Sequence, residues 1–174
     1  MIKTSKIIEL PISVGLREIA YANADKMGKI NNSILQGKGN EAGFIGEEVV
    51  KLYLRDFGDV VEEETFPLRY EYDFLFNGKK CEVKTKQTTV KPKSIYDCSV
   101  ANYNPDQKCD VYIFARVHEF WEVAWILGWM EKEEYFKSSV FLKKGDIDPS
   151  NNYTVKADCH NVKILNLHDI KDLK

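Results

Sequence analysis

Apolar residues recur with a helical spacing in the first third of the chain and with a strand-like spacing after about residue 60. Ser13 precedes a helical pattern that runs toward Met27 and ends at Gly28. A second helical pattern runs from about Asn40 to Phe57. The polar, glycine-bearing segment 29–40 between them predicts a loop.

The middle and end of the chain favour strands. They are expected at residues 60–65, 70–76, 79–86, 110–117 and 121–129, followed by a short helix at 131–137 and a late strand at 162–165. Asn77-Gly78 lies between two of these runs and predicts a two-residue hairpin turn. The order predicts an α/β (or α+β) domain with a mixed central sheet flanked by helices, after an N-terminal helical segment.

The tryptophans leave one alternative open. Trp121, Trp125 and Trp129 recur every four residues, which is a helical period. The residues between them are also apolar, so we interpret the segment as a buried strand ending at Gly128, with a helical dimer face as the alternative.

The hairpin turn fixes a predicted register in which paired residue numbers sum to 155. Tyr72 would pair with Val83, Phe74 with Cys81, Asp73 with Glu82 and Glu71 with Lys84. Since side chains alternate between faces, Tyr72, Phe74, Cys81 and Val83 form the expected core face. The other face holds two opposed carboxylates, Asp73 and Glu82, with Lys84 nearby.

Opposed carboxylates repel each other unless a positive charge lies between them. A divalent cation is the natural candidate, because carboxylate oxygens suit Mg²⁺ or Mn²⁺. An equally weighted interpretation is an ordinary solvated face, with a Glu71–Lys84 ion pair and a tolerated Asp73–Glu82 contact.

The second helix supplies a third acid. Apolar residues cover most of its circumference, and the narrow polar face contains Glu47, Glu48, Lys51 and Arg55. A glutamate on a largely buried helix needs a partner, which Lys51 could provide for Glu47 four residues away. Gly43 and Gly46 lower helix propensity, which indicates close approach of another element, plausibly the hairpin.

Composition narrows the classes of protein. The 174 residues are enough for one domain, expected over 1–174 with a helical extension and loop at 1–39, a core at 40–129 and a C-terminal part at 130–174. Lys and Arg total 25 against 27 Asp and Glu, so a non-specific nucleic-acid-coating protein is disfavoured. There is no apolar run of membrane length and no signal-like N-terminus, and the cysteines are widely spaced. We expect free thiols and a cytoplasmic location.

The residues Gly43-x-x-Gly46-Glu47, Asp73 and Glu82-Val83-Lys84 resemble the PD-(D/E)XK nuclease superfamily, over about residues 40–117. The resemblance implies a restriction-endonuclease-like sheet. It also implies a site in which Asp73, Glu82, Glu47 and the Val83 carbonyl bind Mg²⁺ or Mn²⁺ and Lys84 contacts the attacking water. Residue 72 is Tyr where the motif has Pro, and periodicity does not choose between Glu47 and Glu48. We prefer Glu47, which directly follows the glycine.

The resemblance implies a divalent-metal-dependent deoxyribonuclease. Open alternatives are a structure-selective endonuclease for branched or damaged DNA, and a nuclease-like domain that binds nucleic acid or protein without catalysis. The expected partner is DNA, with single-stranded or branched DNA and a homodimer left open, and no membrane.

A basic run follows the hairpin turn. Residues 79–93 contain six lysines and one acid, which is typical of a phosphate-contacting surface or of a solvated edge. The expected nucleic-acid contacts are Lys80, Lys86, Gln87, Lys91 and Lys93. The histidines His118, His160 and His168 show no zinc-ligand spacing.

Overall fold

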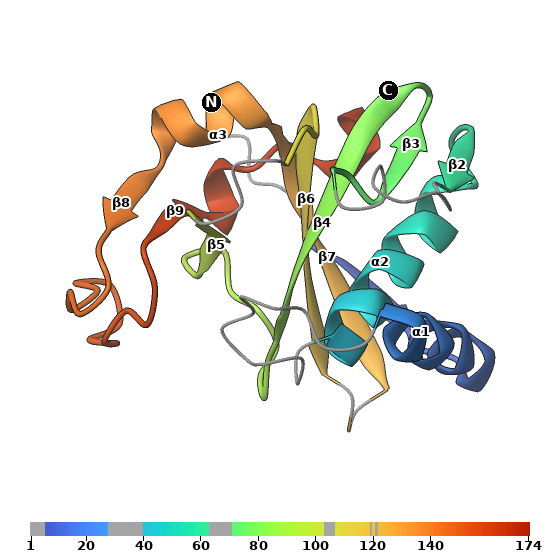
Figure 1. Ribbon diagram of the computed structural model, residues 1–174, viewed down its shortest axis with the longest axis horizontal. Coiled ribbons are helices and arrows are strands. Elements are labelled where there is room, and N and C mark those ends of the chain that lie inside the picture. The colour runs from blue at the N-terminus through green and yellow to red at the C-terminus, as the bar shows by residue number, and fades with distance from the viewer. Residues whose placement is uncertain (1–5, 28–39, 63–70, 103–106, 119, 121) are drawn as a thin grey trace.

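Nine strands in the described parts of the chain form two sheets, and helices cover the larger one (Figure 1). The computed structural model describes residues 6–27, 40–62, 71–102, 107–118, 120 and 122–174. The larger sheet has the order β1 (Ile8–Pro11), β7 (Val123–Glu131), β6 (Val111–His118), β4 (Lys79–Gln87), β3 (Phe74–Phe76), β2 (Val60–Glu62). The smaller sheet has the order β5 (Asp97–Ala101), β9 (Cys159–Lys163), β8 (Val140–Leu142).

The larger sheet is mixed. Strands β4 and β6 are parallel, with Glu82 beside Tyr112 and Lys84 beside Phe114, and the other pairs are antiparallel. The helices are α1 (Val14–Met27), α2 (Asn40–Leu54) and α3 (Lys132–Ser138), with 3₁₀ turns at Ile164–Asn166 and Ile170–Asp172. The predicted class, a mixed central sheet flanked by helices with an N-terminal helical segment, is confirmed.

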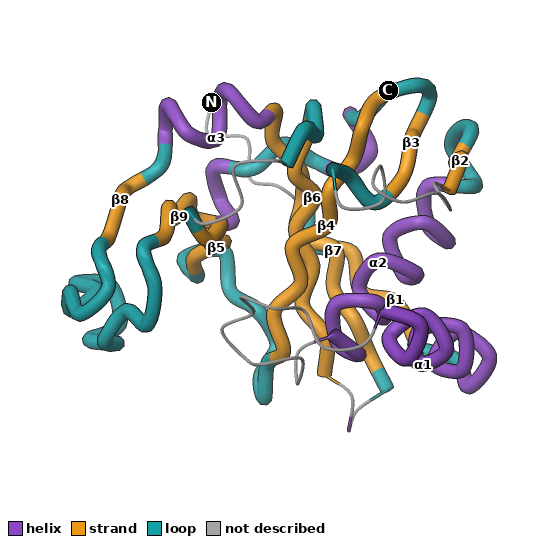
Figure 2. Tube along the Cα trace, in the orientation of Figure 1, coloured by secondary structure: helices purple, strands orange, loops and turns teal. Residues whose placement is uncertain are grey.

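The two faces of the larger sheet are covered differently. Helices α1 and α2 lie on one face, and the smaller sheet with α3 lies on the other, as the secondary-structure colouring of Figure 2 makes clear. Alternate residues of β6 divide between two cores: Ile113 packs under α2, whereas Tyr112 and Phe114 pack toward Tyr135 of α3. The even-numbered residues of β4, including Glu82 and Lys84, therefore face the smaller sheet.

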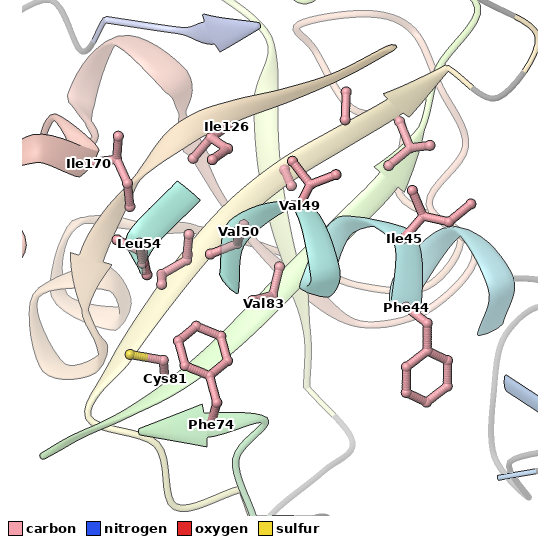
Figure 3. Close-up of a cluster of buried hydrophobic side chains, with 14 of the residues drawn as sticks. Phe44, Ile45, Val49, Val50, Leu54, Phe74, Cys81, Val83, Ile126 and Ile170 are labelled. Atoms are coloured by element: carbon pink, nitrogen blue, oxygen red, sulfur yellow. The ribbon is translucent and has the colours of Figure 1, made fainter. Parts of the chain in front are cut away.

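Helix α2 crosses β4 at very short range. A Cβ added to Gly46 would lie 2.0 Å from the Thr85 hydroxyl oxygen, so a glycine is required there. The close approach that was predicted at Gly46 is confirmed, whereas a Cβ on Gly43 would meet nothing within 4 Å. Figure 3 shows the resulting core, in which Val49 and Val50 of α2 gather with Val83 of β4.

The hairpin turn forms as predicted, but its ladder is short. Asn77 and Gly78 both have positive φ, at 48° and 84°, as a two-residue turn requires. The paired residue numbers sum to 155 at Phe74–Cys81, Leu75–Lys80 and Phe76–Lys79, where the ladder ends. The predicted pairs Tyr72–Val83, Asp73–Glu82 and Glu71–Lys84 are wrong.

Before Phe74 the chain leaves β4 after a main-chain bond from the Asp73 N–H to the Cys81 carbonyl at 2.9 Å, and other contacts follow. The Asp73 carboxylate accepts the Val83 N–H at 2.7 Å, and Glu71 bonds to Lys108 through both backbone and side chain. Tyr72 is buried, but in the core on the side of the smaller sheet. Its predicted place beside Phe74 and Cys81 is therefore wrong.

From Val123 onward the tryptophan segment is a strand, so the helical alternative is wrong there, and Trp121 lies outside the described residues. Trp125 and Trp129 lie in β7, which pairs with β6. The predicted end of the strand at Gly128 is wrong. The strand continues to Glu131, through a register shift opposite Phe114 and Ala115. Gly128 has a φ of 138°, a conformation that favours glycine at such an irregularity.

The other predicted elements agree within a few residues. Ser13 Oγ accepts the Leu16 N–H at 3.1 Å and caps α1, and α2 ends before a turn in which Gly58 N–H bonds to Leu54. The expected 60–65 strand is described only as β2, and Gly28, the 29–39 loop and Tyr70 lie outside the described residues. Strands β1, β5 and β8 were not predicted.

Two expectations from composition are also met in the described residues. Cys81, Cys98, Cys109 and Cys159 are free thiols, with burial raising the pKa of Cys98 to about 12. None of the helices in the described ranges has the length and apolarity needed to cross a membrane.

Candidate functional site

The predicted acids come together where β3 separates from β4. Glu82 lies in β4, Asp73 lies just before β3, and Glu47 lies on α2 directly after the Gly46 crossing point. Glu47 is 7 % exposed and Glu82 is partly buried. Three carboxylates from three segments therefore surround one edge of β4.

The pKa of Asp73 reflects the acids around it. Burial raises the pKa of Asp73 well above its usual value of 3.8, and the charges of Glu82 and Glu47 raise it further. The Val83 N–H and the Lys84 ammonium oppose this rise but do not cancel it. Asp73 makes no ion pair with any residue that the structure describes. The site is therefore short of positive charge at Asp73.

Lys84 lies against Glu82, as the sequence predicts. Its Nζ donates to Glu82 Oε1 at 2.7 Å and lies 5.9 Å from the centre of the Tyr112 ring. Burial alone would lower the pKa of Lys84, but Glu82 and Asp73 outweigh burial and raise it. Lys84 is thus a protonated ammonium at neutral pH, held beside the carboxylates.

Val83 contributes main-chain groups at the same edge. Because the N–H and C=O of one strand residue point to the same side, the Val83 carbonyl points toward the edge where its N–H meets Asp73. This is the place that a ligand role for the carbonyl requires.

Glu47 and Glu48 differ in the residues on which they act. Glu47 is one of the two acids that raise the pKa of Asp73, and Glu48 is not. Glu48 instead contacts Asn23 of α1 at 3.4 Å and Lys51 at 2.6 Å. These contacts favour Glu47 as the acid of the site.

Lys51 contacts more acids than the sequence indicated. Its Nζ lies 3.1 Å from Glu47, 2.6 Å from Glu48 and 2.6 Å from Glu62 of β2, and the lysine is 2 % exposed. Burial would lower the pKa of Lys51, but Glu47 and Glu48 raise it above its ordinary value. The predicted Glu47–Lys51 pair is part of a group of four.

The fit of these residues to a divalent cation can be judged from their chemistry and positions. Carboxylate and carbonyl oxygens are the ligands that Mg²⁺ and Mn²⁺ prefer, and an excess of negative charge surrounds Asp73. Among the described residues, however, no three His, Cys, Asp or Glu side chains converge as a metal-binding group. Each acid is turned instead toward its own nitrogen donor: Lys51, Val83 N–H or Lys84. The donor set fits the cation, and binding requires these side chains to turn.

The predicted nucleic-acid residues do not form one stripe. Lys80 lies on the same face of β4 as Lys84 and Lys86, at 5.6 Å from the Tyr72 ring. Lys79 faces the other side, over Trp129. Gln87 is exposed at the end of β4, and Lys91 and Lys93 follow in the next loop, where Lys91 pairs with Glu9 at 3.1 Å.

Sequence reasoning missed the contribution of β6. Parallel pairing places Tyr112, Phe114 and Arg116 beside Glu82, Lys84 and Lys86. Cys109 also lies close, and its pKa is raised to about 11 by burial and by Glu82. The one available signal was a charged residue, Arg116, in an otherwise apolar strand.

The structure thus places Glu82, Glu47 and Lys84 close enough to Asp73 for their charges to act on it, without bringing three acids together as a metal-binding group in the described residues. The resemblance noted above depends on those residues. Comparison of the chain with protein-family models, with curated proteins and with solved structures gives no match.

Proposed function

We propose that the protein is a divalent-metal-dependent nuclease that hydrolyses phosphodiester bonds in DNA. The observation that carries the proposal is the placement of the acids at β4: Asp73 accepts the Val83 N–H at 2.7 Å, and Glu82 accepts from Lys84 at 2.7 Å. In agreement with this placement, burial and the charges of Glu82 and Glu47 raise the pKa of Asp73. A strand edge whose carboxylates are only partly compensated by lysines is well suited to hold a cation.

In the proposed site, Asp73, Glu82, Glu47 and the Val83 carbonyl hold Mg²⁺ or Mn²⁺. The cation would supply activation of water and stabilisation of charge on the phosphate. Lys84, now bonded to Glu82 at 2.7 Å, would be the residue that donates to the attacking water or to a phosphate oxygen. The buried floor formed by Tyr112 keeps the lysine at this position.

Cleavage assays test the proposal directly. Plasmid, linear duplex, single-stranded DNA and a four-way junction are each incubated with Mg²⁺, Mn²⁺ or EDTA. Wild-type protein should cleave at least one substrate with metal and none with EDTA, and Asp73→Asn and Lys84→Met should abolish cleavage. Lys144→Met, in the turn after β8, is a charge-matched control that should cleave normally. Unchanged cleavage by the Asp73 and Lys84 variants contradicts the proposal.

The four-way junction addresses the structure-selective alternative. Symmetric cleavage of the junction, with linear DNA left intact, would assign the protein to branched DNA. Equal cleavage of linear DNA would remove that alternative.

A second candidate function is nucleic-acid binding without catalysis. It is favoured by the observation that the three acids do not converge in the described structure. Calorimetry with millimolar Mn²⁺ separates the two candidates. Binding that Asp73→Asn weakens supports the nuclease, and DNA binding without metal binding supports the non-catalytic domain.

A further inference from the structure

Two basic side chains lie beside each other one step along β4 from Lys84. Lys86 and Arg116 are register partners on the parallel strands β4 and β6. They lie on the face that carries Lys84, two residues further along, which corresponds to about 6.6 Å of strand. Like charges placed opposite each other on neighbouring strands are unfavourable unless an opposite charge offsets them.

Arg116 is buried and only partly satisfied. It is 7 % exposed, and one Nη donates to the Asp97 backbone carbonyl at 3.1 Å. Its guanidinium lies 5.2 Å from the centre of the Tyr96 ring, which covers one face of the group. A guanidinium has five N–H donors in a planar fork, which suits phosphate recognition. No carboxylate of the described residues forms an ion pair with it.

The carboxylate of Asp97, the residue whose carbonyl accepts from Arg116, is already bound. Asp97 Oδ1 lies 3.2 Å from Lys163 Nζ, and Asp97 Oδ2 accepts a bond from Ser150 at 2.8 Å. Lys86 is exposed and forms no hydrogen bond or ion pair with any described residue. Burial and the charge of Arg116 lower the pKa of Lys86. Asp97 and Asp148 oppose this lowering of the Lys86 pKa without cancelling it, so this part of the face carries two positive charges that these acids offset only in part.

We propose that Lys86 and Arg116 bind a phosphate group of the substrate strand adjacent to the one that Lys84 contacts. The proposal rests on the proposed nuclease function, because it takes the ligand to be a nucleic-acid strand continuing past the cleaved bond. The exposed Lys86 meets the phosphate first, and the Arg116 fork, held by Asp97 and Tyr96, fixes its position. The cleaved strand would then run along β4.

The test is DNA binding measured by fluorescence anisotropy in EDTA, where no cleavage takes place. The probe is a short labelled DNA strand, used alone and annealed to its complement, over a series of salt concentrations. Lys86→Ala should weaken binding about 3- to 5-fold, and Arg116→Gln about 10-fold at low salt. Each substitution should make the plot of log K against log salt less steep, by about 0.7 for the single strand or 0.9 for the duplex.

Two features of the test distinguish the loss of a phosphate contact from a loss of folding. Lys86 is exposed, so Lys86→Ala should fold normally even if Arg116→Gln is destabilised. If both residues hold one phosphate, the double variant should lose much less than the product of the two single losses. Lys144→Ala is the matched control and should keep both affinity and slope.

The outcomes separate this inference from the proposed function. If Lys86→Ala keeps wild-type affinity and slope while metal-dependent cleavage still depends on Asp73, the phosphate site is refuted and the nuclease stands. If Lys86→Ala and Arg116→Gln weaken binding as expected but no DNA is cleaved with any metal, the phosphate site stands and hydrolysis is refuted. Absence of DNA binding by the wild type at every salt concentration refutes the phosphate site.

Discussion

The acids around Lys51 and the acids around Asp73 use the same residue types, but their charges are balanced in different ways. In the first group, which we call the Lys51 cluster, one buried ammonium lies between Glu47, Glu48 and Glu62, within 3.1 Å of each. In the second, which we call the Asp73 cluster, Lys84 pairs with Glu82 on one side, and the Asp73 carboxylate accepts the Val83 N–H and forms no ion pair within the described ranges.

The position of the cation explains the difference. A central cation stabilises each surrounding acid, and the pKa of Lys51 is accordingly raised despite its burial. A peripheral cation leaves acids facing one another, and burial together with the charges of Glu82 and Glu47 raises the pKa of Asp73. Lys51 completes a structural cluster, whereas the Asp73 cluster would gain stability from a further cation under the proposed function. This contrast is what makes the second cluster the candidate for metal-dependent chemistry.

The largest expected effect is on catalysis by the Asp73 cluster. Asp73→Asn keeps an oxygen to accept the Val83 N–H but removes the charge that would hold a cation. Metal-dependent cleavage should fall by about 100-fold or more, while the fold is retained. The initial cleavage rate and the far-UV circular dichroism spectrum check both parts. A folded variant that retains most of its cleavage rate would remove Asp73 from the site.

The next effect is on stability and comes from the Lys51 cluster. Lys51→Met removes the central cation and leaves three acids together, so the free energy of unfolding should fall by about 3–5 kcal/mol. Urea denaturation measures the change, with the exposed Lys144→Met as a control that should stay within about 0.5 kcal/mol. A small loss for Lys51→Met would mean that the cluster is not a structural element.

The close approach that places Glu47 near β4 gives a third, smaller effect. A methyl group on Gly46 would overlap Thr85, so Gly46→Ala should cost about 1–3 kcal/mol of unfolding free energy. Gly43→Ala lies in the same helix with open space and should instead stabilise by up to about 1 kcal/mol. Combining Gly46→Ala with Thr85→Gly should recover part of the loss. Equal effects at the two glycines would contradict the crossing geometry.

The smallest effect is the pH dependence of stability. Because the pKa of Asp73 is higher in the folded protein than the unfolded value near 3.8, the folded state binds more protons just above that pH. Asp73 therefore costs stability at neutral pH, and this cost is relieved as the pH falls through the folded pKa. Asp73→Asn should gain stability relative to wild type as the pH rises from about 4 toward 7. Unfolding free energies over this range measure the difference, and a difference that stays constant with pH would contradict the raised pKa.

The cation should change that pH dependence. Millimolar Mg²⁺ or Mn²⁺ should raise the melting temperature of the wild type at pH 7 but not that of Asp73→Asn. At pH values where Asp73 is protonated, the wild type should lose this response. The Lys144→Met control should respond as the wild type does.

Local features of the sequence predicted most elements of the fold. Asn77-Gly78 specifies its turn because both residues accept positive φ, and Ser13 caps α1 with its own hydroxyl. The apolar runs around Trp125 and Ile113 indicated buried strands. These signals depend on neighbours within a few residues, so they can be read without knowing the rest of the fold. The spacing of the residues and the resemblance likewise identified the candidate site residues Glu47, Asp73, Glu82 and Lys84.

The tertiary structure decided how these pieces meet. It replaced the expected Asp73–Glu82 pair with a bond from the Val83 N–H to the Asp73 side chain, and it moved Tyr72 to the other core. It also set the parallel register that places Arg116 beside Lys86. A sequence pattern identifies which residues favour a strand, but the choice of neighbouring strand depends on packing between segments far apart in the chain. The site's chemistry was therefore suggested by the sequence, and its balance of charge was decided by the fold.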